Sequence, residues 1–375
     1  MAKERKRANG EGSVYKRKDG RWTARMTLPI GKRKDFFGKT RAEVNGKLID
    51  AMKKHRDGLP VVNERQTVAQ FLASWLESAK PALRTRTHVT YEGLIRLHVS
   101  PGIGRVILSR LTPQHLQRLY SERLAAGLSP QSVRHLHAVI HRALEQAARW
   151  SLVHRKVADL VTPPRVQRHE MRTLDPEQAR RFLNAATGDR LEALYVLALT
   201  TGMRLGELLA LRWRDVDLDA GSLSVRGTLL RTKEGMTISE PKTAGSRRHV
   251  SIGGLAIDGL RRHRVNQTAE RLLKGPAWQD NDLVFANEVG KPIEDTNLRR
   301  RSFEPLLAKA GVPRIRFHDL RHTAATLLLG QGIHPKIVSE RLGHSRVSIT
   351  LDLYSHVTPT MQRQAVEAME TLLRA

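Results

Sequence analysis

The feature that most constrains this chain is a set of cationic, imidazole and phenolic side chains spread over three distant segments. The first segment is Thr201-Gly202-Met203-Arg204-Leu205-Gly206-Glu207. The second is Pro241-Lys242-Thr243, which leads to Ser246-Arg247-Arg248. The third holds His318-Asp319-Leu320-Arg321-His322, then Leu342-Gly343-His344-Ser345, then Tyr354. In chain order these residues read Arg, Lys, His-x-x-Arg, His and Tyr, a set suited to attacking a phosphodiester.

The charge of the chain favours a polyanionic partner. Lys and Arg total 65 against 37 Asp and Glu, so the formal net charge is +28, and counterion release would drive binding to nucleic acid. A solvated basic surface or a membrane-surface binder is the alternative. The basic N-terminus lacks the apolar run of a signal peptide, and residues 193–201, the most apolar stretch, are too few to span a membrane. We therefore expect a soluble, cytoplasmic protein. It has no cysteine, which excludes disulfides and thiolate metal sites.

Residues 1–58 predict a small separate domain of three strands and a helix. Asp19-Gly20 is a hairpin signal between extended runs at 12–15 and 21–27, and a third run at 34–38 precedes a helix capped by Thr40. Residues 1–60 hold 18 Lys and Arg against 7 Asp and Glu. The interleaved aromatic residues could form only a small core, but we expect an outer basic face as well, able to enter a major groove. The candidate DNA contacts are Lys16, Arg17, Lys18, Arg21, Arg25, Lys32, Arg33 and Lys34.

A linker at 59–65 leads to a predicted all-helical bundle over residues 65–162. Thr67 can cap a helix with apolar residues at helical spacing, and further helices are expected at 90–97, 113–126 and 129–150, the last of them capped by Ser129. Taken one by one, the basic residues of this bundle are ordinary for a solvated face. Next to a catalytic domain that acts on DNA they become candidate phosphate contacts, above all Arg84, Arg86, Arg134 and Arg142.

A proline-broken linker at 161–169 is followed by a third domain over residues 172–375. Asp175 and Pro176 indicate a helix start, and the remainder reads as mostly helix, including 205–211, with a β section from 222 to 251. The fold class is therefore mainly α with small β sections (α+β). The tail has one apolar helical face, formed by Met361, Ala365, Val366, Met369, Leu372 and Leu373. This face could pack on its own domain or on a neighbouring protomer.

His318 and Arg321 are three residues apart, so a helix would present both on one face toward one phosphate. His318 and His322 are also spaced as in zinc-binding helices. However, that motif needs Glu directly after the first His, and Asp319 stands there. We therefore do not expect a metal site.

The three motif segments together resemble the tyrosine recombinases, and within them the integrases of phages and integrative elements that carry an N-terminal arm-binding domain. The resemblance covers essentially the whole chain. It implies an arm-type DNA-binding domain at 1–58, a SAM-like core-binding domain at 65–162 and a catalytic domain at 172–375. It also implies double-stranded DNA with core-type and arm-type sites as partner, a homotetramer on that DNA, and accessory factors such as a host DNA-bending protein and an excisionase.

The resemblance also implies a role for each motif residue. Tyr354 is the nucleophile that forms a 3′-phosphotyrosyl link, and Arg204 and Arg321 hold the non-bridging oxygens. Lys242, on a β-hairpin, protonates the leaving 5′ oxygen. His318 carries a proton, His344 donates a hydrogen bond to the phosphate, and Glu207 supports the cluster from behind. No metal, ATP or other cofactor is implied. Two alternatives stay open: a non-catalytic DNA-binding regulator with this fold, and DNA relaxation like that of type IB topoisomerases.

Overall fold

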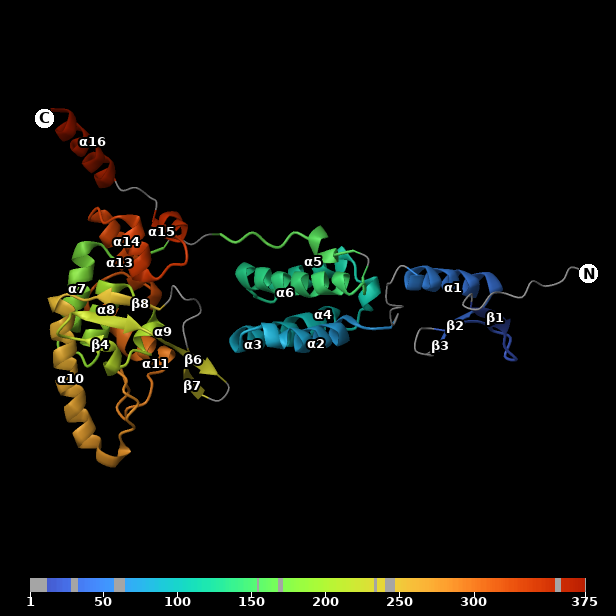
Figure 1. Ribbon diagram of the computed structural model, residues 1–375, viewed down its shortest axis with the longest axis horizontal. Coiled ribbons are helices and arrows are strands. Elements are labelled where there is room, and N and C mark those ends of the chain that lie inside the picture. The colour runs from blue at the N-terminus through green and yellow to red at the C-terminus, as the bar shows by residue number, and fades with distance from the viewer. Residues whose placement is uncertain are drawn as a thin grey trace, which may run out of the picture. The chain divides into compact units, whose positions relative to one another are not determined.

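The computed structural model describes residues 12–27, 33–56, 65–153, 155–167, 171–232, 235–239, 247–354 and 359–374. The chain divides into two compact units, Met1–Arg168 and His169–Ala375 (Figure 1). Most of the described elements are helices, and the sheets are small and antiparallel, so the predicted fold class is confirmed. Within the described ranges, no helix has the length and apolar character needed to cross a membrane.

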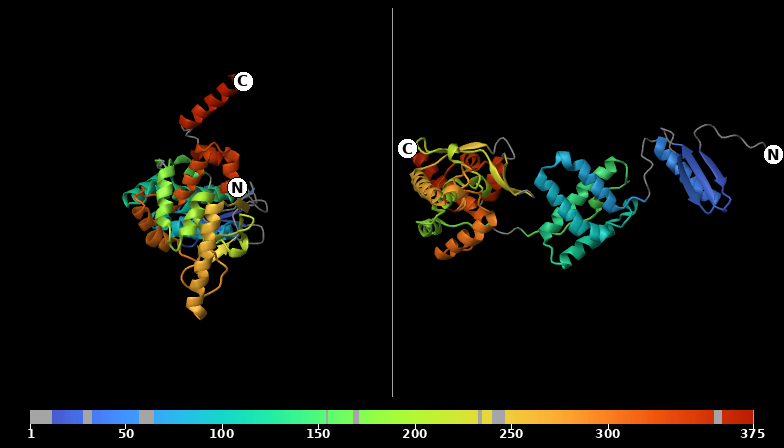
Figure 2. Two further views of the ribbon diagram at one scale, coloured as in Figure 1. Left: turned by 90° about the vertical axis from the view of Figure 1, so that its left-hand side faces the viewer. Right: turned by 90° about the horizontal axis from the view of Figure 1, so that it is seen from below.

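The N-terminal part is a three-stranded antiparallel sheet backed by one helix (Figure 2). Its strands are β1 (Ser13–Lys16), β2 (Trp22–Thr27) and β3 (Arg33–Gly38), and α1 (Arg41–Arg56) packs on one face. The Thr40 hydroxyl accepts from the Glu43 amide, as expected of a cap. Between sheet and helix lies a small core of Ala24, Met26, Phe36, Val44, Leu48 and Ala51. The predicted hairpin and helix are confirmed.

A helical bundle follows, with a core of its own. It consists of α2 (Val68–Ala79), α3 (Thr85–Leu94), α4 (Ser100–Ile103), α5 (Pro113–Ala125) and α6 (Pro130–Arg149). Thr67 and Ser129 cap α2 and α6 through their hydroxyls, as predicted. The predicted helix at 90–97 has the wrong bounds: α3 begins at Thr85, and a π-helical turn follows at Ile95–Val99. No residue of α3 is fully buried. A helix without a buried face has no apolar periodicity in its sequence, so the bounds of α3 could not be recognised from the pattern.

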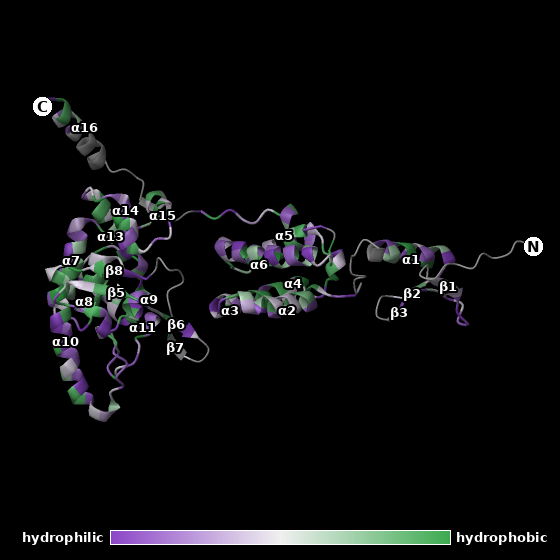
Figure 3. Cartoon of the chain, viewed as in Figure 1, coloured by the Kyte–Doolittle hydropathy of each residue, from purple (hydrophilic) through white to green (hydrophobic). Residues whose placement is uncertain are grey.

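The C-terminal unit is built around α8 (Glu192–Thr201), which is buried along nearly all its length and is coloured hydrophobic in Figure 3. Against it pack α7 (Pro176–Ala186), α10 (Gly254–Lys274) and α13 (Phe317–Gly330). Shorter helices α11 (Asp295–Leu298) and α12 (Glu304–Lys309) precede α13. After it come α14 (Pro335–Leu342), α15 (Val347–Tyr354) and α16 (Pro359–Arg374).

The predicted β section is confirmed as two small sheets. β4 (Val216–Asp217), β5 (Ser222–Val225) and β8 (Arg248–Ser251) form one, and β6 (Thr228–Thr232) and β7 (Gly235–Ser239) form a hairpin. The predicted helix at 205–211 is a single turn, α9 (Leu205–Leu208). After it, the amides of Ala210 and Leu211 bond only three residues back, and the Leu211 carbonyl then accepts from the Val284 amide at 2.9 Å in an extended pairing.

Candidate active site

Two left-handed glycines bring the distant motif segments together. Gly202 ends α8 with φ 65° and Gly343 ends α14 with φ 68°, a backbone region that favours glycine. A side chain on Gly202 would collide with Leu342, so α8 and α14 end side by side. Arg321 of α13 donates from Nη1 to the Gly202 carbonyl at 2.8 Å and is 3% exposed. The Gly202 turn thereby sets Arg204 close to Arg321.

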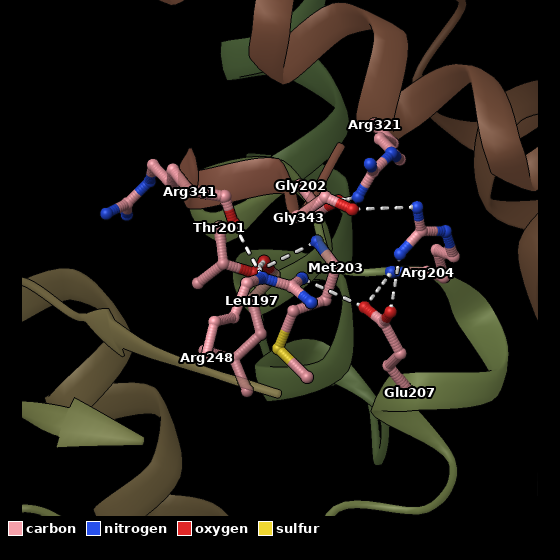
Figure 4. A network of polar contacts seen from close by, with 10 residues as sticks. All are labelled: Leu197, Thr201, Gly202, Met203, Arg204, Glu207, Arg248, Arg321, Arg341 and Gly343. Atoms are coloured by element: carbon pink, nitrogen blue, oxygen red, sulfur yellow. Dashed lines mark hydrogen bonds and ion pairs between the residues drawn. The ribbon is translucent and has the colours of Figure 1, made fainter. Parts of the chain in front are cut away.

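Arg204 is held from two sides (Figure 4). Its Nη1 donates to Glu207 Oε1 at 2.7 Å, and its Nη2 donates to the Gly343 carbonyl at 3.3 Å. The Arg204 side chain is nevertheless 38% exposed, whereas Glu207 is 5% exposed. The arrangement fixes the guanidinium while leaving part of it open to a phosphate.

Glu207 also binds a second arginine, Arg248 of β8. Arg248 Nη2 lies 2.9 Å from Glu207 Oε2, and Arg248 Nε donates to the Arg341 carbonyl at 2.8 Å. Arg341 in turn donates to the Thr200 carbonyl. Burial raises the pKa of Glu207, but the hydrogen bond from Arg248 and the charges of Arg248 and Arg204 outweigh it and leave that pKa below its ordinary value. The carboxylate is therefore ionised and bridges two cations.

Three imidazoles lie at the same site. The rings of His318 and His322 meet edge to face with centroids 4.9 Å apart. Burial, followed by the charges of His322, Arg321 and Arg204, lowers the pKa of His318 to about 4. The His318 residue keeps an exposed surface, so a bound phosphate could offset those charges. The pKa of His344 is also lowered to about 4, by burial and then by Arg321 and Arg204. Both rings are neutral at neutral pH in the free protein.

The structure thus brings five of the predicted site residues together, namely Arg204, Glu207, His318, Arg321 and His344. Tyr354 is the last residue of α15, and its side chain lies outside the described atoms. Lys242 lies outside the described residues, between β7 and β8. Over the parts of the chain that the structure describes, no group of three or more His, Cys, Asp or Glu is placed to hold a metal ion.

Three further residues of the site had no role assigned from the sequence. Arg248 stands in the Ser246-Arg247-Arg248 motif, but only the fold reveals that it reaches Glu207. Arg341 and Thr350 lie near the His344 motif, and Thr350 Oγ1 is 2.8 Å from His344 Nδ1. Neither residue type signals a contact by itself, so the sequence offered no means of finding them.

The predicted DNA contacts of the N-terminal part fall on different faces. Arg17 lies over the Phe37 ring on the face that α1 leaves open, and Arg33 is exposed on the same face. Arg25 makes a two-pronged ion pair with Asp35, with distances of 2.6 and 2.8 Å. Lys34 stacks over Phe36 on the α1 side. Lys16, Lys18 and Arg21 are exposed, whereas Lys32 lies outside the described residues.

In the helical bundle, all four candidate contacts are exposed. Arg84 and Arg86 lie at the start of α3, and Arg134 and Arg142 lie on α6. Arg142 Nη1 donates to the Tyr91 hydroxyl at 3.4 Å, and Tyr91 stacks on the buried Trp75. This contact links the basic side of α6 to α3.

Comparisons with known proteins identify the family of the chain. A model of the phage integrase family matches residues 172–361, and one of the phage integrase N-terminal SAM-like domain matches residues 67–124. The chain is 32% identical to a tyrosine recombinase XerC-like protein of Caldanaerobacter subterraneus subsp. tengcongensis, over 95% of this chain and 97% of that protein.

Two solved structures share the fold. The Tn1549 transposon integrase in complex with transposon right end DNA has a TM-score of 0.70 at 22% identity, covering 81% of this chain and 99% of that one. A lambda integrase tetramer bound to a Holliday junction has a TM-score of 0.56 at 17% identity, covering 92% and 96%. Because the catalytic family match spans half of the chain and the full-length relative exceeds 30% identity, the chain belongs to the phage integrase family of tyrosine recombinases, enzymes that break and rejoin DNA in site-specific recombination.

Proposed function

We propose that this recombinase cuts DNA by attack of the Tyr354 hydroxyl on a scissile phosphate, which gives a 3′-phosphotyrosyl link and a free 5′-hydroxyl. The observation that carries the proposal is the meeting of Arg204, Arg321, His318 and His344 around the Gly202 and Gly343 turns. The helix that leaves this cluster, α15, ends at Tyr354. A cationic cluster and a nucleophile on the adjacent helix are the two parts that such a reaction needs.

Each residue has one task in the proposed reaction. Arg204 and Arg321, which stay charged at any physiological pH, bind the two non-bridging oxygens and stabilise the extra negative charge of the transition state. His318, neutral in the free protein, accepts the tyrosine proton as the new P–O bond forms. Lys242 gives a proton to the leaving 5′ oxygen, and His344 donates a hydrogen bond to the phosphate. When the 5′-hydroxyl of a partner duplex attacks the phosphotyrosine, the same groups run in reverse and the proton returns to Tyr354.

We propose that the three predicted domains divide the DNA between them. The open face of the N-terminal sheet, which carries Arg17, Arg33 and the exposed aromatic rings of Tyr15 and Phe37, binds arm-type sites. The basic residues of α3 and α6 bind the core-type site. A chain that holds two sites on one duplex needs the intervening DNA to bend. A host DNA-bending protein and an excisionase are the accessory partners that would control this bend.

We further propose a homotetramer on DNA, because exchange of both strands between two duplexes uses four active sites. The lambda integrase structure is a tetramer bound to a Holliday junction, which supports the same assembly here. The tail supports it too, since α16 exposes Val366, Met369, Leu372 and Leu373, the last two at 77% and 79%. Docking of this apolar face on a neighbouring protomer would bury it.

The test is covalent capture of DNA. Wild-type protein and Tyr354→Phe are incubated with supercoiled plasmid and with duplex fragments tiling the DNA on both sides of the gene, then resolved on a denaturing gel. We expect a protein–DNA adduct with wild type on one or more fragments and none with Tyr354→Phe, although both proteins bind that fragment. Tight binding without any wild-type adduct would instead indicate a DNA-binding regulator. Relaxation of plasmid without joining of two fragments would indicate a topoisomerase.

A further inference from the structure

The most informative unassigned contact in the site joins His344 to Thr350. His344 follows the left-handed Gly343, and the amides of both residues bond back to the end of α14, to the carbonyls of Ser339 and Glu340. Its Nδ1 lies 2.8 Å from Oγ1 of Thr350, the fourth residue of α15. Thr350 is completely buried, whereas His344 is half-buried. One edge of the imidazole is therefore held inside the protein, and the other is free to face a substrate.

The hydroxyl of Thr350 makes a different contact from those of six other helical threonines in the described part of the chain. A threonine inside a helix commonly donates its hydroxyl proton to the carbonyl four residues earlier. Six threonines of the described residues do so: Thr90, Thr200, Thr201, Thr268, Thr323 and Thr371. The hydrogen bond recorded for Thr350 goes to the imidazole instead.

The hydrogen-bond partners available to the Thr350 hydroxyl indicate the tautomer of His344. A hydroxyl carries one proton, and a buried donor without an acceptor is unfavourable. If His344 donated from Nδ1, the hydroxyl proton of Thr350 would need another acceptor, and the described residues provide it with none. The contact therefore favours donation from the hydroxyl to Nδ1, which would leave the remaining ring proton on Nε2.

We propose that Thr350 is a positioning residue that presents the Nε2–H of His344 to the scissile phosphate and couples this donor to the helix that carries the nucleophile. The proposal rests on the proposed function of His344 as a phosphate donor. Thr350 and Tyr354 lie one helical turn apart on α15. A shift of α15 that misplaces Tyr354 would also break the contact to His344, so the hydrogen-bond donor and the nucleophile reach their working positions together.

The ionisation state of His344 makes the tautomer decisive. The cations Arg321, Arg204 and Arg248 surround the ring together with His322, and after burial they are what lowers its pKa, to about 4. A neutral imidazole has one donor nitrogen and one acceptor nitrogen. Without Thr350, the ring could turn its unprotonated Nε2 toward the phosphate oxygens and repel them.

The experiment is a double-mutant cycle on the rate of covalent adduct formation, with the fragment that wild type cleaves. Thr350→Val keeps the shape of the side chain but removes the hydroxyl, and Thr350→Ser keeps the hydroxyl. We expect Thr350→Val to slow adduct formation about 10-fold to 100-fold, the range found when the partner that orients a metal-bound histidine is removed, and Thr350→Ser to restore most of the rate. In a His344→Ala background, Thr350→Val should change the rate by less than about threefold, because coupled residues are not additive.

The outcomes separate the two proposals. If His344→Ala alone cuts at the wild-type rate, the assigned role of His344 is wrong. If His344→Ala is slow but Thr350→Val is as fast as wild type, the positioning role of Thr350 is overturned. The role is overturned equally if Thr350→Val lowers the rate of the His344→Ala protein by the same factor by which it lowers the wild-type rate.

A second readout does not depend on catalysis. In ¹⁵N-histidine-labelled protein, with His344 assigned by its loss in His344→Ala, two-bond ¹H–¹⁵N spectra should show a protonated Nε2 and a bare Nδ1. Thr350→Val should yield a mixture of tautomers. A wild-type ring protonated on Nδ1 would contradict the proposal even if every variant were slow.

Discussion

Glu207 and Arg248 form an ion pair in which Oε2 and Nη2 are 2.9 Å apart, and their side chains are only 5% and 7% exposed. The pair joins α9 to β8, and the Nε of Arg248 extends the link to α14 through the Arg341 carbonyl. The same carboxylate holds Arg204 at 2.7 Å. Three elements that carry site residues are therefore tied together by one buried carboxylate and two guanidinium groups.

Removing Arg248 should be costly for stability. In Arg248→Ala, Glu207 keeps its burial but loses one of its two cations, and breaking a buried pair typically costs about 3–5 kcal/mol. Arg299→Ala is the matched control, because Arg299 and Asp295 form a pair with side chains 47% and 56% exposed, worth about 0–1 kcal/mol. Urea unfolding of the two variants measures both losses. Equal losses would contradict the structural importance of the buried pair.

The left-handed turn at Gly343 should be specific to glycine for two reasons. A Cβ there would meet Nη1 and Cδ of Arg248 at 2.9 and 3.1 Å, in addition to the strain of φ 68°. Gly332 is an excellent control, since its φ is 77° but a Cβ would meet nothing within 4 Å. We expect Gly332→Ala to lose only about 1–2 kcal/mol of stability and to keep forming the DNA adduct. Gly343→Ala should lose more and should form little adduct, because the Gly343 carbonyl binds Arg204. Similar adduct yields in the two variants would argue against this turn as part of the site.

Binding of DNA should raise the pKa values of His318 and His344 from about 4. A phosphate offsets the cations that, after burial, keep both rings neutral. At about pH 5.5, between that lowered value and the ordinary 6.5 of histidine, binding should therefore take up protons, whereas at about pH 8 it should take up none. Calorimetry of Tyr354→Phe in buffers of different ionisation enthalpy measures this uptake. Replacing both His318 and His344 by Asn should abolish the proton uptake. The control His249→Asn, at an exposed residue, should leave the uptake unchanged. Equal uptake at both pH values would contradict the assignment.

The open face of the N-terminal sheet should bind DNA through phosphate contacts. We expect Arg17→Ala and Arg33→Ala each to weaken binding to arm-type DNA and to lower the slope of log affinity against log salt by about 0.9. Lys53→Ala removes an equal charge from the exposed side of α1, which covers the opposite face of the sheet, and should change neither. Fluorescence anisotropy over a salt series measures both quantities. If Lys53→Ala weakened binding as much as Arg17→Ala, the DNA would not be bound by the open face.

How far the sequence could predict the structure depended on how local each signal was. The Asp19-Gly20 turn and the caps at Thr40, Thr67, Ser129 and Asp175 each act within a few residues, and the structure contains all of them. The bounds of α3 could not be predicted because that helix buries no residue completely.

The site shows the same limit at longer range. The motif residues Arg204, His318, Arg321 and His344 could be named because their types and order resemble a known set. The contact of Arg248 with Glu207 spans 41 positions and that of Arg204 with Gly343 spans 139, and nothing in the local sequence specifies such pairings. They arise from the packing of α8, α13 and α14, as does the burial that shifts the pKa values of the imidazoles.

The decisive measurement for the proposed reaction is to identify the amino acid that becomes linked to DNA. The covalent adduct on the cleaved fragment is digested with nuclease and protease, and the peptide that carries the nucleotide is sequenced by mass spectrometry. We expect a phosphodiester that joins the hydroxyl of Tyr354, one of only 5 tyrosines in the chain, to the 3′ end of a nucleotide. A nucleotide linked to any other residue, or attached through its 5′ phosphate, would contradict the central claim.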